Sequence, residues 1–148
     1  MTTTAMTTMA MTEAAGFPPF AAPGRARRVR RGRVAALSGV AAEAGVERHY
    51  RASGRPVVAR RWRGAAGEID LVVREGARVV FVEVKAARSF EAAATRLGRR
   101  QMDRLCAAAE EFVGQEPGGL LTEMRFDLAL VDRSGAVKVI ENAFGSDW

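Results

Sequence analysis

The strongest pattern along the chain is a pair of short apolar runs on either side of a turn. The first run covers residues 67–74, the second covers residues 79–85, and Gly76 lies between them. Runs of this length that are rich in branched apolar residues and flank a glycine are typical of a β-hairpin. We therefore expect two antiparallel strands here, at the centre of the fold.

Charged residues occupy defined faces of this predicted hairpin. Side chains alternate along a strand, so Ile69 and Leu71 are predicted to share one face while Asp70 lies on the other. On the second strand, Glu83 and Lys85 share a face. The two acidic residues meet only in a suitable register, because a slip by one residue moves every side chain to the opposite face.

The length of the hairpin loop decides that register. A four-residue loop over residues 75–78 pairs Arg74 with Val79 and places Asp70 directly opposite Glu83. A two-residue loop places the same carboxylates diagonally, and a three-residue loop separates them unless a β-bulge compensates. Both even loops predict a pair of neighbouring carboxylates.

The other elements follow from periodicity and from turn-forming residues. In the first helix, the predicted apolar stripe consists of Val34, Leu37, Ala41, Ala44 and either His49 or Tyr50. A helix between the strand of Glu83 and the next strand favours a parallel crossover, and hence a mixed α/β sheet flanked by helices. In chain order we expect a helix over 34–53, a strand over 56–63, the hairpin, a helical region over 90–113 divided near residue 98, and strands over 125–131 and 136–140.

Positive charge is concentrated near the N-terminus. Of the net charge of +6, residues 1–33 hold six arginines and one acid, whereas residues 34–148 are close to neutral. We expect residues 1–33 to be a disordered tail that ends in a basic arm, and residues 34–148 to form one domain. The arm suits contact with phosphates, and it equally suits a merely solvated tail.

Residue counts exclude several classes of protein. No apolar run approaches the roughly 20 residues needed to cross a bilayer, and no secretory signal is expected. Cys106 is the only cysteine, which excludes an intramolecular disulfide and a cysteine-based zinc site and favours the cytoplasm. His49 is the only histidine, which excludes a multi-histidine metal site and a Ser-His-Asp triad. We expect Cys106 in the core and His49 on the helix surface.

The paired carboxylates are the candidate chemistry. Like charges that face each other on a sheet destabilise it, and burial adds to the cost. A divalent cation removes that cost, because Mg²⁺ accepts one or two carboxylates and completes its shell with water and phosphate oxygens. An ordinary solvated hairpin face, with Lys85 paired to Glu83 or Asp70, fits the same pattern.

A resemblance to a known family bears on this choice. Five motifs occur in family order, at residues 61–63 (Arg-Trp-Arg), 67–71 (Gly-Glu-Ile-Asp-Leu), 81–85 (Phe-Val-Glu-Val-Lys), 125–127 (Arg-Phe-Asp) and 141–144 (Glu-Asn-Ala-Phe). They resemble the YraN-like bacterial family of predicted endonucleases. That family is similar to archaeal Holliday-junction resolvases, within the PD-(D/E)xK superfamily. The resemblance implies a restriction-endonuclease-like α/β fold, a mixed sheet flanked by helices.

The resemblance also implies roles for single residues. Asp70 and Glu83 would be metal ligands for Mg²⁺ or Mn²⁺, and Lys85 would be the catalytic lysine. Glu43 resembles the acidic residue that joins such sites from the first helix. Gln101 resembles the polar residue on the helix after the lysine strand, where the family usually has Lys-Gln and this chain has Arg-Gln. The implied activity is a structure-selective DNA endonuclease acting in recombination or repair, and paired cuts in a branched DNA favour a homodimer.

Several arginines are candidates for contact with DNA. Three of them surround Trp62, where the aromatic ring is able to stack or to pack in the core. The expected nucleic-acid contacts are Arg60, Arg61, Arg63, Arg88, Arg99 and Arg100. Asp127 is expected to pair with Arg125 or a neighbour. A non-catalytic nucleic-acid-binding or accessory protein on the same fold is the alternative.

Overall fold

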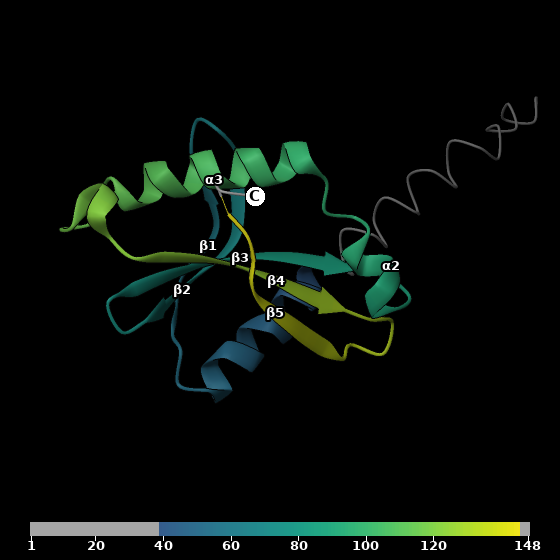
Figure 1. Ribbon diagram of the computed structural model, residues 1–148. Helices are drawn as coiled ribbons and strands as arrows, with labels where there is room; N and C mark the ends of the chain where they lie inside the picture. The colour runs from purple at the N-terminus through teal and green to yellow at the C-terminus, as the bar shows by residue number, and fades with distance from the viewer. Residues whose placement is uncertain (1–38, 146–148) are drawn as a thin grey trace, which may run out of the picture.

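The computed structural model describes residues 39–145 of the chain (Figure 1). The predictions made for residues 1–33, and for the apolar positions Val34 and Leu37, lie outside the described residues. Within the described part of the chain, no helix is long and apolar enough to cross a membrane.

A five-stranded mixed sheet forms the middle layer. The strands are β1 (Val57–Arg63), β2 (Glu68–Glu75), β3 (Arg78–Ala86), β4 (Met124–Val131) and β5 (Val137–Phe144). They lie side by side in sequence order. β3 and β4 are parallel, and the other neighbouring pairs are antiparallel. The predicted fold class, a mixed α/β sheet flanked by helices, is confirmed.

Helices cover both faces of this sheet. The first helix is described over residues 39–52, and it lies on the face opposite to α3 (Arg99–Val113) in Figure 1. The short helix α2 (Phe90–Ala94) and α3 together connect the parallel strands β3 and β4. Gly98 is the N-cap of α3, so the predicted division of this helical region is correct. A 3₁₀ turn, Gly119–Leu121, leads into β4.

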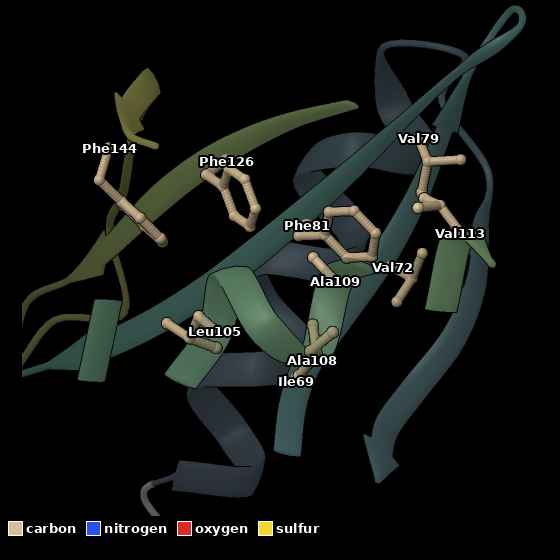
Figure 2. Packing of buried hydrophobic residues seen from close by; sticks show 10 residues of the cluster. All are labelled: Ile69, Val72, Val79, Phe81, Leu105, Ala108, Ala109, Val113, Phe126 and Phe144. Carbon is tan, nitrogen blue, oxygen red and sulfur yellow. The ribbon is translucent and has the colours of Figure 1, made fainter. Parts of the chain in front are cut away.

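The core beneath α3 is built from large side chains of four strands. Phe81 stacks on Phe126 with ring centroids 5.5 Å apart, and Phe126 lies 5.0 Å from Phe144. Figure 2 shows these rings facing Leu105 and Ala109 of α3. Cys106 packs against the same cluster, half-buried. Burial of this apolar area fixes α3 against the sheet, and with it the position of the residues at its N-terminal end.

The first helix packs on the other face through a stripe that differs from the predicted one. Ala42, Val46 and Tyr50 are buried, whereas Ala41 and Ala44 are exposed. The predicted stripe was right in offering Tyr50 and wrong for the two alanines, because alanines occur on several sides of this helix and mark no face. The buried stripe follows the larger side chains at a spacing of four residues. His49 lies on the surface, as predicted.

The hairpin register is the one that brings the carboxylates level. Arg74 pairs with Val79, and the chain turns at Gly76 with a φ of 60°. The pairing reaches Leu71 and Val82, so the next step along each strand is Asp70 beside Glu83. This is the register predicted for the four-residue loop, although the strands extend further and leave only a two-residue turn.

The predicted alternation of faces fails at one position. Ile69 packs in the α3 cluster together with Val72, whereas Leu71 packs beneath the first helix. Ile69 therefore does not share the face of Leu71. The change of face occurs between Ile69 and Leu71, at the step that contains Asp70.

The neighbouring strand β1 changes face at the same step. Ala59 and Trp62 both pack in the α3 cluster, three positions apart. Between them Arg61 has a φ of 46°, in the left-handed region that residues other than glycine rarely adopt. Arg61 lies between the pairs Arg60 with Leu71 and Trp62 with Ile69, so it faces Asp70 across the sheet. A matched irregularity in two strands thus surrounds this carboxylate.

Candidate active site

The predicted site residues gather at one end of the sheet. Asp70 is near the start of β2, and Glu83 and Lys85 are near the end of β3, which runs in the opposite direction. Gln101 is in the first turn of α3. The antiparallel pairing of β2 with β3 and the packing of α3 bring these four side chains to the same place.

Asp70 is held by the backbone of the neighbouring strand. Its Oδ2 accepts a hydrogen bond from the N–H of Val84 at 2.8 Å. The backbone pairing between β2 and β3 extends as far as Leu71 and Val82, so the Asp70 carboxylate binds a backbone N–H that lies beyond the paired residues. The carboxylate is therefore fixed beside the segment that carries Glu83 and Lys85.

Glu83 is buried and has two polar partners on one oxygen. Its side chain is only 5% exposed. Oε1 accepts a hydrogen bond from Nε2 of Gln101 at 2.6 Å and lies 3.0 Å from Nζ of Lys85. Lys85 itself is 18% exposed, so its ammonium group lies at the boundary between the interior and solvent. Gln101 and Lys85 together orient the buried carboxylate.

The surroundings of Asp70 make its ionised form costly. Burial raises the pKa of Asp70 to about 7, and the negative charge of Glu83 contributes in the same direction. The hydrogen bond from Val84 opposes this rise, and the charge of Glu43 adds a smaller increase. A carboxyl group whose pKa lies near neutrality marks a site where negative charge is costly, which is common where a cation or a substrate is bound.

Glu43 lies near Asp70 but is paired with another residue. Its Oε2 pairs with Nε of Arg61 at 3.0 Å, between the first helix and β1. Within residues 39–145, no three histidine, cysteine, aspartate or glutamate side chains are gathered closely enough to hold a metal together. The predicted set of three ligands, Glu43 with Asp70 and Glu83, is therefore not assembled.

Asp70 and Glu83 still fit a hard divalent cation. Mg²⁺ is commonly bound by one or two carboxylates, with water and substrate oxygens as its remaining ligands. The raised pKa of Asp70 is an independent sign of fit, because a bound cation would favour the ionised form that burial disfavours. The residues that would hold the ion are these two acids.

Three of the arginines predicted to contact DNA are engaged with glutamates. Arg60 makes two hydrogen bonds to Glu47, and Arg61 pairs with Glu43. Arg63 pairs with Glu68, with Nε and Oε2 2.7 Å apart. These contacts are largely exposed, so they are weak and exchangeable.

The other three predicted arginines lie between the end of β3 and the start of α3. Arg99 is paired with Asp103 at 3.5 Å. Arg88 and Arg100 are exposed, and neither has a carboxylate partner among residues 39–145. Contact of any of these arginines with nucleic acid stays a prediction.

A buried polar network on the other face was only partly predicted. Asp127 is fully buried, and its two oxygens accept hydrogen bonds from the Arg125 guanidinium at 2.8 and 3.0 Å. The Tyr50 hydroxyl donates to Oδ2 at 2.8 Å, and the N–H of Asn142 donates to Oδ1 at 3.1 Å. Burial, followed by the charge of Asp127, raises the pKa of Tyr50. The pairing with Arg125 was predicted, but the tyrosine was not, because its partner is 77 residues away.

Comparison with known proteins identifies the family. The family described as "Uncharacterised protein family UPF0102" matches residues 42–131. The chain belongs to the UPF0102 family. This confirms the YraN-like part of the resemblance, and the matched segment contains every candidate site residue named above.

Relatives match over most of their length. A UPF0102 protein of Cereibacter sphaeroides (strain ATCC 17029) is 59% identical over 115 residues, which cover 78% of this chain and 98% of the relative. A UPF0102 protein of Roseobacter denitrificans is 57% identical over 116 residues, covering 78% and 90%. A UPF0102 protein of Dinoroseobacter shibae is 50% identical over 118 residues, covering 80% and 87%.

Proposed function

We propose that the protein is a metal-dependent DNA endonuclease that acts on branched or otherwise distorted DNA. The observation that carries the proposal is the pair of carboxylates, half-buried Asp70 and buried Glu83, with Lys85 in contact with Glu83. Two acids and a lysine at the ends of adjacent strands are the groups that hydrolysis of a phosphodiester requires. A solvated hairpin face would leave these side chains exposed, whereas Glu83 is buried.

Each residue has a distinct part in this reaction. Mg²⁺ or Mn²⁺ held by Asp70 and Glu83 would supply Lewis-acid chemistry and neutralise charge on the phosphate. Gln101 fixes Glu83 through its hydrogen bond to Oε1, so the carboxylate keeps one orientation. Val84 does the same for Asp70 through its backbone N–H. The protein's contribution is therefore mainly positioning and electrostatics.

Lys85 is the group that acts directly on the reacting atoms. Its ammonium nitrogen lies 3.0 Å from Glu83 and reaches partly into solvent, where an incoming phosphate would lie. There it orients the attacking water and offsets the negative charge that develops as the new P–O bond forms and the bond to the leaving oxygen breaks. The products are one strand end with a phosphate and one with a hydroxyl group.

The proposal extends to location and assembly. The substrate is double-helical DNA with a branch or flap, the compartment is the cytoplasm, and two copies act together where two matched cuts are needed. Arg88 and Arg100, exposed and free of carboxylate partners among residues 39–145, are the arginines best placed to hold the substrate backbone. Along the chain, Arg88 follows Lys85 by three residues and Arg100 directly precedes Gln101.

Cleavage of labelled DNA tests the proposal. Four-way junction, flap, single-stranded and plain duplex DNA are incubated with Mg²⁺ or Mn²⁺ and with wild type, Asp70→Asn or Lys85→Met. Glu110→Gln and Lys138→Met, which alter exposed residues on other surfaces, are the matched controls. We expect cutting that requires the metal and that falls by about 10²–10⁴-fold in the Asp70 and Lys85 variants alone. Equal cutting by all variants, or no cutting by folded protein that binds the DNA, contradicts the proposal.

A further inference from the structure

A cavity of about 490 Å³ lies between the first helix and the ends of β3 and β4. Ala41, Ala42 and Gly45 of the helix form one wall, and Ala86 and Ala87 form part of the other. The cavity exists because these side chains are small where a helix crosses a sheet. Its volume is in the range of sites that bind small organic ligands.

Two arginines give the cavity a positive rim. Arg48 and Arg133 line it, and neither has a carboxylate partner among residues 39–145. Asp132 also lines it, but its Oδ1 accepts hydrogen bonds from the N–H and hydroxyl groups of Ser134 and from the N–H of Ala136. Its Oδ1 is used by its own turn, and neither arginine forms an ion pair with it, so the two guanidinium groups remain available to an anion.

The cavity lies close to the proposed active site along the chain. Ala86 and Ala87 directly follow Lys85, and the N–H of Ala87 bonds to the carbonyl oxygen of Val131 at 3.0 Å. The two sites are on opposite faces of β3, because Glu83 contacts α3 whereas Ala42 and Val131 belong to the cluster beneath the first helix. A strand that passes around the end of β3 would therefore meet both.

We propose that this cavity binds one unpaired nucleotide of the substrate strand, next to the phosphate that is cut; this inference rests on the proposed nuclease function. The alanine walls suit the flat apolar face of a base. Arg48 and Arg133 suit its phosphate, since guanidinium groups bind phosphate oxygens and also stack on bases. A free phosphate needs no apolar cavity, and an apolar ligand needs no pair of arginines.

This assignment gives the enzyme a reason to select distorted DNA. A base inside an intact duplex is paired and stacked, so it enters a cavity only at the cost of unpairing and unstacking, a few kcal/mol. A base at a junction, a flap or a single strand has already lost part of those contacts. The cavity therefore favours substrates in which the nucleotide beside the cut is unpaired.

Binding without cleavage tests this proposal. Fluorescence anisotropy of labelled single-stranded and duplex oligonucleotides is measured in EDTA, so the readout does not depend on activity. Ala41→Trp fills the cavity from an exposed helix position, and Arg48→Glu and Arg133→Glu reverse its charge. Ala52→Trp and Arg51→Glu are the matched controls on the same helix, outside the cavity.

We expect each cavity variant to weaken single-strand binding by about tenfold, with a much smaller effect on duplex and with the controls close to wild type. Circular dichroism tests whether the variants are folded, and the arginine variants keep the test decisive if Ala41→Trp unfolds the protein.

Wild-type affinity in the folded variants, or an equal loss for duplex, overturns the proposal. Cutting that requires Asp70 but is unchanged by the cavity variants leaves the nuclease and rejects the cavity. Single-strand binding that requires the cavity, in a protein that never cuts DNA, keeps the cavity as a binding site and rejects the nuclease.

Discussion

The carboxylate of Asp70 accepts a hydrogen bond from the backbone N–H of Val84, 14 residues further along the chain. The contact lies just beyond Leu71 and Val82, the last paired residues of β2 and β3. A side chain therefore occupies a backbone donor at the point where the strands separate. Because Val84 lies between Glu83 and Lys85, this one bond fixes the distance between the two halves of the proposed site.

The first prediction concerns the pH dependence of stability in the metal-free protein. The pKa of Asp70 is raised from 3.8 to about 7 by burial and by Glu83. Between these values the folded protein holds a proton that the unfolded chain releases, so the free energy of unfolding decreases as pH rises through this window. Asp70→Asn removes the titrating group, and its amide oxygen is still able to accept from Val84. We expect the variant to become more stable than wild type by on the order of 2 kcal/mol above pH 7, and not at pH 4.

Urea unfolding in EDTA at several pH values measures this difference. Asp103→Asn, on the exposed surface of α3, is the control and should keep the wild-type pH profile. A difference between Asp70→Asn and wild type that is constant from pH 4 to pH 8 would show that Asp70 has an ordinary pKa.

The second prediction concerns a divalent cation. Mg²⁺ or Mn²⁺ that binds the folded protein but not the unfolded chain raises the melting temperature, by about 2–4 °C for each kcal/mol in a protein of this size. We expect this rise at pH 8 and a smaller one at pH 6, where a proton on Asp70 competes with the metal. Asp70→Asn and Glu83→Gln should abolish it, whereas Glu110→Gln should not. An equal rise in all four proteins, measured by differential scanning fluorimetry, would indicate nonspecific binding.

The third prediction concerns the buried network of Asp127. Removing the cation in Arg125→Met leaves a fully buried carboxylate without its charged partner, at a cost of about 3–5 kcal/mol. Tyr50→Phe removes one hydrogen bond from a neutral donor to the same carboxylate and should cost about 1–3 kcal/mol. Arg78→Met breaks a more exposed ion pair to Glu123 and should cost less than about 1 kcal/mol. Urea unfolding ranks the three variants, and equal losses would refute the network's structural role.

The hairpin and its register followed from the sequence because they are local. The alternation of apolar residues and the position of Gly76 restrict the strands to a few registers, and the even ones bring Asp70 and Glu83 together. The division of the helical region at Gly98 is local in the same sense. Gln101 was placed by the resemblance alone, and its contact with Glu83 depends on how α3 packs across the sheet.

The positions that the sequence did not predict depend on contacts between distant segments. The first helix turns toward the sheet on the side of Val46 and Tyr50, and Tyr50 is held there by Asp127. Alanines lie on several sides of the helix, so periodicity alone placed Ala41 and Ala44 in the buried stripe and did not choose between His49 and Tyr50. Glu43 was predicted to join the metal ligands, but its partner is Arg61, whose backbone conformation has no signal in the sequence.

The fourth prediction tests that backbone conformation. Arg61 has a φ of 46°, which costs roughly 1–2 kcal/mol for a residue with a Cβ atom and nothing for glycine. Arg61→Gly should therefore be more stable than Arg61→Ala by about 1 kcal/mol, because both variants lose the same exposed pair with Glu43 and only glycine relieves the strain.

Arg60 is the matched control, since it lies in the same strand and has a negative φ. There the order should reverse, with Arg60→Ala the more stable variant, because glycine in an ordinary strand position costs conformational entropy. Urea unfolding of the four variants decides the matter. If alanine is preferred at both positions, the left-handed conformation at Arg61 is absent in solution, and the change of face beside Asp70 must have another cause.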